Sequence, residues 1–109
     1  MKDPDRPERR PERDEGLAVR EKPKTQKPRL YKVLLHNDDY TTQEFVIHLL
    51  MEVFRKDLTE ATAIMLHVHT KGLGVAGIYT RDVAETKVSV GTKMARESGM
   101  PLLLTMEAE

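Results

Sequence analysis

An abrupt change in composition at Leu30 is the feature that most constrains how this chain can fold. Five of the six prolines lie at positions 4, 7, 11, 23 and 28, among dense charges, and only residues 17–19 form an apolar group before residue 30. Such a segment cannot offset the conformational entropy that ordering would cost. We therefore expect residues 1–29 to be a disordered N-terminal extension and residues 30–109 to form one small domain.

The composition excludes several classes of protein. The chain has no cysteine, so neither a disulfide framework nor a thiolate metal site can hold the fold together, and an oxidising compartment is not implied. No apolar run approaches the roughly 20 residues that cross a bilayer, and a domain this small leaves little room for an enclosed active site. We expect a soluble, cytoplasmic protein that does not enter a membrane.

The formal net charge is zero, but the charge is unevenly distributed. Residues 1–29 hold ten Lys and Arg against seven Asp and Glu, whereas the remaining 80 residues hold eight basic and eleven acidic side chains. The domain is therefore acidic and offers nucleic acid no broad basic face. Nothing in the sequence demands more than a monomer.

Hydrophobic spacing from residue 30 onward predicts six elements in the order β-α-α-β-α-β. Apolar runs at 30–35, 73–79 and 102–106 are typical of strands, and apolar residues recur at helical spacing over 42–55 and 58–71. A third helix should begin at a cap on Thr80 or Asp82 and run to about Ser98, with a face of small residues: Ala84, Val88, Gly91 and Ala95. We expect an α+β fold in which a three-stranded antiparallel sheet carries three helices on one face.

Capping signals indicate where the first two helices begin and end. Thr41 and Glu44 have the spacing of a capping box before the first helix, and Asp57 and Glu60 repeat it before the second. Gly72 should end the second helix, because glycine readily adopts the left-handed conformation found there.

Two histidines separated by one residue, His67 and His69, together with the Asn37-Asp38-Asp39 turn, raise the question of a metal site. Residues two apart on an α-helix point about 200° away from each other, so these imidazoles could share a metal only on a strand. The apolar stripe of the segment favours a helix, and we expect neither metal nor cofactor. A metal-dependent hydrolase that uses the turn and a histidine is an alternative, without a convincing third ligand or an oriented base.

An apolar pocket with a polar mouth is another interpretation of the same residues. Its floor would be formed by Val46, Met65 and Val68, and its mouth by Asn37 and His69, with Asp38 nearby. An amide oxygen, an imidazole nitrogen and a carboxylate all accept hydrogen bonds, so together they could bind a free α-amino group. A plain turn, in which Asn and Asp bond their own backbone, is the simpler reading of the polar cluster.

Four segments of the chain resemble the ClpS adaptor family in order and spacing. They are residues 31–45, the segment Met65-Leu66-His67-Val68-His69, residues 83–88 with their Ala-Glu-Thr-Lys core, and Pro101-Leu102-Leu103. The resemblance implies an adaptor that performs no covalent chemistry. It would recognise N-degrons, which are proteins with a free N-terminal Phe, Tyr, Trp or Leu, and deliver them to a Clp/Hsp100 AAA+ unfoldase such as ClpA, and through it to the ClpP protease.

The resemblance also implies roles for individual residues in substrate binding. Asn37 and His69 match the family's α-amino ligands, and Asp38 matches the residue that helps to hold the start of the peptide backbone. Gln43 stands where many relatives have a gating methionine, which leaves open whether the pocket admits β-branched side chains or binds aromatic ones less well. The positions that line the family's side-chain pocket are Asp39, Thr41, Val46, Met65, Val68 and Leu102.

Three further positions match the face that ClpS-like proteins turn toward the N-terminal domain of the unfoldase: Tyr40, Asp82 and Lys87. Lys87 flanks the small-residue stripe, so we expect its side chain to be exposed. The family also uses its N-terminal extension to engage the unfoldase. A protein-interaction domain of similar topology with no amino-end pocket, binding ribosomal or translation factors, is the other alternative.

Overall fold

Six elements follow one another in the predicted order in the computed structural model, which describes residues 27–109. The extension expected over residues 1–29 therefore lies almost entirely outside the described residues. The elements are β1 (Leu30–His36), α1 (Gln43–Glu52), α2 (Leu58–Lys71), β2 (Leu73–Thr80), α3 (Arg81–Glu97) and β3 (Leu103–Ala108).

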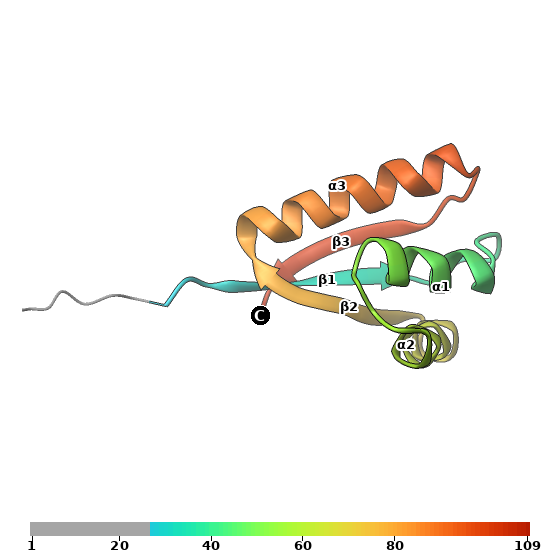
Figure 1. Cartoon of the computed structure of the whole chain (residues 1–109), viewed down its shortest axis with the longest axis horizontal. Helices are drawn as coiled ribbons and strands as arrows, with labels where there is room; N and C mark the ends of the chain where they lie inside the picture. Colours follow the sequence, from blue (N-terminus) through green and yellow to red (C-terminus); the bar gives the residue numbers. More distant parts are fainter. Residues whose placement is uncertain (1–26) are drawn as a thin grey trace, which may run out of the picture.

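The three strands form one antiparallel sheet with β1 in the centre, in the order β2-β1-β3. Val33 and Leu35 of the central strand are 0% exposed, because this face of the sheet is covered by the helices. In Figure 1, α3 runs along β3, α2 lies beside β2, and α1 packs against α2. The predicted fold class, an α+β sheet with helices on one face, is confirmed.

The first helix begins one residue later than the capping pattern predicted. The N-cap is Thr42, whose hydroxyl accepts a hydrogen bond from the Phe45 backbone at 3.1 Å. The prediction of Thr41 as the cap was wrong because the Thr41 hydroxyl is occupied by Asp38 at 2.7 Å. Asp57 caps α2 as predicted, by accepting from the Glu60 backbone at 2.8 Å.

The second helix ends at Gly72, whose φ of +85° confirms the predicted left-handed cap. Its N–H bonds the carbonyl of Val68 at 2.8 Å. The chain then reverses directly into β2, so the last turn of α2 and the first residue of β2 are held close together. This tight connection brings the end of α2 to the same edge of the domain as the loop after β1.

The small-residue face of α3 packs against the sheet. Ala84, Gly91 and Ala95 are buried, and a Cβ built on Gly91 would lie 2.6 Å from Cδ2 of Leu104 on β3. Glycine at this position thus allows the helix to approach the strand closely. Within the described part of the chain, no helix combines the length and the apolar character needed to cross a membrane.

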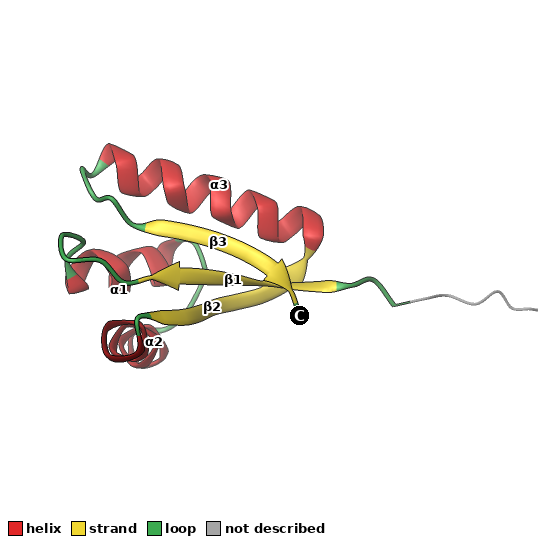
Figure 2. Cartoon of the chain, turned by 180° about the vertical axis from the view of Figure 1, so that it is seen from behind, coloured by secondary structure: helices red, strands yellow, loops and turns green. Residues whose placement is uncertain are grey.

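The domain has two distinct ends. The C-terminus lies beside the start of β1, where the backbone N–H of Glu109 bonds the carbonyl of Leu30 at 2.9 Å (Figure 2). The loop from Asn37 to Thr42 follows the opposite end of β1. Polar residues of that loop therefore lie at the end of the domain away from the point where the chain enters it.

Candidate functional site

The turn that follows β1 is organised by the carboxylate of Asp38. Its Oδ1 accepts from the backbone N–H groups of Tyr40 at 2.8 Å and Thr41 at 2.7 Å, and its Oδ2 accepts from the Thr41 hydroxyl at 2.7 Å. Both carboxylate oxygens are thus used within the turn. The simpler reading of the polar cluster, a turn held by its own side chains, describes Asp38 correctly.

These bonds lower the pKa of Asp38 below its ordinary value. Desolvation by burial is the largest single influence and acts in the opposite direction, but it is outweighed by the hydrogen bonds from Thr41 and Tyr40 together with the positive charge of Arg96. Each of these favours the ionised form. The turn therefore carries a fixed negative charge at neutral pH.

We expect Asp38→Asn to lower the free energy of unfolding at pH 7 by about 1 kcal/mol, the usual net contribution of one hydrogen bond. The folded pKa is depressed, so the carboxylate's contribution is complete above the unfolded pKa of about 4 and is lost as the pH falls through the folded pKa. Thermal unfolding should therefore separate variant and wild type at pH 7, and the difference should become smaller as the pH falls below about 4. Asp39→Asn, the same charge change at the next residue, is the control, and an equal effect of both would contradict the prediction.

Asn37 is tied to the end of α2 by its backbone. Its N–H donates to the carbonyl of Gly72 at 2.9 Å. Gly72 directly follows the last turn of α2, which carries His69. The bond therefore brings the two polar side chains expected at the pocket mouth, those of Asn37 and His69, to the same place although they are distant in sequence.

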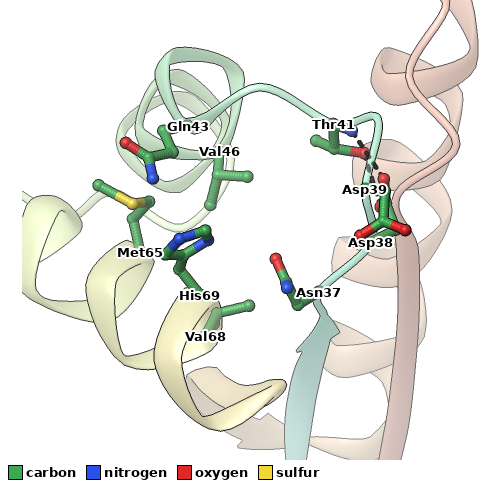
Figure 3. Close-up of a pocket in the computed structure, with 9 residues that line it drawn as sticks. All are labelled: Asn37, Asp38, Asp39, Thr41, Gln43, Val46, Met65, Val68 and His69. Atoms are coloured by element: carbon green, nitrogen blue, oxygen red, sulfur yellow. Dashed lines mark hydrogen bonds between the residues drawn. The ribbon is translucent and has the colours of Figure 1, made fainter.

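A cavity of about 210 Å³ lies between this turn and the two helices. It is smaller than the roughly 300–1,000 Å³ of pockets that hold drug-sized ligands, so it suits a single side chain. Figure 3 shows Asn37 and His69 from different elements facing the same space, with the Asp38 turn across from α2. The lining comprises nine of the ten predicted substrate-site residues: Asn37, Asp38, Asp39, Thr41, Gln43, Val46, Met65, Val68 and His69.

The apolar floor of the cavity comes from both helices. Val46 of α1 and Met65 and Val68 of α2 are all buried members of the hydrophobic core. Val68 is set by Gly74 on β2, because a Cβ at Gly74 would lie 2.7 Å from Cγ2 of Val68. The missing side chain of Gly74 thus allows β2 to press against the wall of the cavity.

Two predicted residues take positions that the sequence did not specify. Gln43, in the first turn of α1, is exposed and stands on the same side of the cavity as Met65 (Figure 3). Leu102 is not among the residues that line the cavity; it is 1% exposed and belongs to the hydrophobic core.

The two histidines point to different surfaces, as helical spacing predicted. His69 lines the cavity, whereas His67 lines a separate groove with Glu60, Ala63, Ile64 and Val75. Among residues 27–109, no three His, Cys, Asp or Glu side chains gather in a way that could hold a metal ion.

The three residues expected to face an unfoldase do not form one patch. Tyr40 is 79% exposed in the turn beside the cavity, and Asp82 is exposed at the start of α3, near the other end of the domain. Lys87 is half-buried, which contradicts its predicted exposure. Its Nζ donates to the carbonyl of Val53 at 2.6 Å and lies 5.7 Å from the ring centroid of Tyr79.

Comparison with known proteins identifies the family. The model of the family described as ATP-dependent Clp protease adaptor protein ClpS matches residues 26–105. The chain belongs to the ClpS family. Curated ClpS adapter proteins are similar over most of their length: that of Myxococcus xanthus is 61% identical over 88 residues, covering 81% of this chain and 82% of the relative. The ClpS of Lawsonia intracellularis is 57% identical over 84 residues, which is 77% of each chain.

A solved ClpS structure has the same fold. The structure of Agrobacterium tumefaciens ClpS2 bound to L-phenylalaninamide matches with a TM-score of 0.73 and 43% sequence identity, covering 76% of this chain and all of that one. Membership of the ClpS family makes this protein an adaptor of the Clp protease.

Sequence reasoning missed two residues that shape this site. Gly74 sets the position of Val68, and Arg96 donates hydrogen bonds to the backbone of the segment that precedes β3. Neither residue has a local sequence signal. Each acts on a residue that comes close to it only when the chain folds or bends back on itself. Isolated glycines and arginines in such patterns are too common to single out.

Proposed function

We propose that this ClpS family member is an N-degron adaptor, which binds proteins through a free N-terminal Phe, Tyr, Trp or Leu and delivers them to a ClpA-like AAA+ unfoldase for degradation by ClpP. The observation that carries the proposal is the convergence of Asn37 and His69 at the mouth of a small cavity with an apolar floor. The ligand of the similar ClpS2 structure supports it, since L-phenylalaninamide offers an aromatic side chain next to a free amine.

The first side chain of the peptide and its ammonium group are both needed for useful affinity. Burying one Phe or Leu side chain contributes about 1.5–3 kcal/mol, and each hydrogen bond to a charged group about 1.5–3 kcal/mol. Micromolar binding requires about 8 kcal/mol, which only the side chain and the ammonium group together can approach. We expect micromolar to submicromolar affinity, determined by the first residue of the peptide.

The decisive experiment compares a labelled peptide that begins with Phe with its N-acetylated twin, by fluorescence anisotropy. Acetylation removes the charge and two of the three N–H donors of the ammonium group that Asn37 and His69 would bind, so we expect affinity to fall about 100-fold or more. Equal affinity for the two peptides would contradict the proposal and favour an interaction domain without an amino-end pocket. A peptide that begins with a free Asp is the control for the side-chain cavity, because it keeps the ammonium group but lacks an apolar first side chain.

Delivery also requires a contact with the unfoldase. Tyr40 and Asp82 are the exposed candidates, and they lie near opposite ends of β1. Asp82 shares a shallow pocket with Pro28 and Arg29, which directly precede β1. We therefore propose that the main unfoldase contact lies at the end of the domain where Pro28 and Arg29 lead into β1, because a partner bound there leaves the mouth of the substrate pocket open.

A further inference from the structure

Arg96, in the last turn of α3, holds the backbone of the segment that leads into β3. Its Nη1 donates to the carbonyl of Met100 at 2.8 Å and to that of Leu102 at 3.1 Å. The two carbonyls lie on either side of Pro101, which has no N–H of its own to anchor the chain. One guanidinium group thus fixes both halves of this connection.

The segment that Arg96 holds lies next to the mouth of the cavity. His36 pairs with Leu103 at the end of the β1–β3 ladder, and Asn37 and Leu102 are the next residues along the two strands. The side chain of Leu102 is locked in the core. The backbone of Leu102 is therefore fixed from one side by packing and from the other by Arg96.

The same guanidinium acts on the turn itself through its charge. Arg96 is among the groups that lower the pKa of Asp38, after burial, which opposes the shift, and the hydrogen bonds from Thr41 and Tyr40. In Figure 3 the ribbon of the last helix and strand passes next to the turn that carries Asp38 and Asp39. Arg96 thus holds the segment before β3 by hydrogen bonds and adds positive charge near the neighbouring turn.

We infer that Arg96 is a positioning residue for the amino-end pocket, which fixes the segment at Met100 and Leu102 against the turn that presents Asn37 and Asp38. Arg96 is not among the residues that line the cavity, so it acts without touching the peptide. The inference rests on the proposed function, because it assigns a role in that same site. Arg96 acts through its positive charge and through one terminal nitrogen, Nη1, which donates both hydrogen bonds.

The test uses Arg96→Gln, Arg96→Lys and the control Lys93→Gln. Lys93 is exposed one turn earlier on the same helix, so its loss changes the net charge equally. We expect Arg96→Gln to weaken binding of the free Phe peptide about tenfold, the equivalent of one hydrogen bond to a charged group. Arg96→Lys should weaken it only about threefold, since an ammonium keeps the charge but its nitrogen lies one bond closer to the backbone than Nη1, and Lys93→Gln should bind like the wild type.

A second readout separates positioning of the turn from a general loss of stability. The carboxyl pKa of Asp38, followed by NMR, should rise in Arg96→Gln and stay low in Arg96→Lys, because only the first variant removes the charge. Melting temperatures are recorded for every variant. If Arg96→Gln fails to fold, Arg96→Lys decides, because wild-type affinity in that variant would overturn the inference.

The outcomes distinguish this inference from the proposed function. Tenfold weaker binding together with a raised Asp38 pKa in Arg96→Gln supports the inference. Wild-type affinity in a folded Arg96→Gln overturns it, while the proposed function stands as long as the wild type prefers the free peptide to the acetylated one. Equal affinity of the wild type for both peptides overturns the proposed function and the inference together.

Discussion

Replacing His69 by alanine is expected to weaken binding of a free Phe peptide by about 10- to 100-fold, which corresponds to one hydrogen bond to a charged group. His69 lines the cavity opposite Asn37, and its side chain is exposed rather than part of the core, so the substitution removes an acceptor without disturbing packing. Fluorescence anisotropy with the labelled peptide measures the change directly.

The chain supplies a closely matched control for this experiment. His67 lies two residues earlier on the same helix and lines a different groove, so His67→Ala should bind the peptide like the wild type. The N-acetylated peptide adds a second comparison, because it has no ammonium for His69 to bind and its weak affinity should be the same in wild type and His69→Ala. Equal losses in His67→Ala and His69→Ala would exclude His69 as a specific ligand.

The second large effect concerns stability. We expect Gly91→Val to lower the free energy of unfolding by about 3 kcal/mol or more, the upper end of the cost of overpacking a core. A side chain at Gly91 meets Cδ2 of Leu104 at 2.6 Å and Cδ1 of Leu49 at 3.7 Å, and both leucines are buried. In a domain of this size each kcal/mol lowers the melting temperature by roughly 4–8 °C.

Ser89→Val is the matched control for Gly91→Val. Ser89 lies two residues earlier on α3 and is exposed, so the substitution carries the helix cost of a β-branched residue without the contact with β3. Thermal unfolding should show a small change for Ser89→Val and a large one for Gly91→Val. Similar melting temperatures for the two variants would show that the close approach of α3 to β3 does not depend on glycine.

The half-buried Lys87 changes how substitutions at that position should be interpreted. Its ammonium group holds the carbonyl of Val53, the C-cap of α1, and α1 carries Gln43 and Val46 of the cavity. A loss of delivery on replacing Lys87 would therefore combine any unfoldase contact with a displacement of α1. Asp82, which is exposed, is the better residue for probing the unfoldase contact alone.

Much of the fold could be predicted from sequence because its determinants are local. The period of apolar residues fixed the type of each element, and the caps at Asp57 and Gly72 lie within a few residues of the backbone groups that they bind. The same helical period separated His67 from His69. The choice between Thr41 and Thr42 as the first cap was missed because it depends on which hydroxyl Asp38 engages.

For the candidate site, too, local features could be predicted from the sequence, whereas contacts between distant residues could not. Sequence by itself determined the residue types that could meet at a pocket and, through helical spacing, that Met65, Val68 and His69 share one side of α2. Only the tertiary structure decided that Asn37 meets the end of α2, that Leu102 is buried in the core without lining the cavity, and that Lys87 turns inward. These outcomes depend on contacts between residues far apart in the chain, such as Asn37 with Gly72 and Lys87 with Val53. Local periodicity contains no information about such partners, because packing of the whole domain selects them.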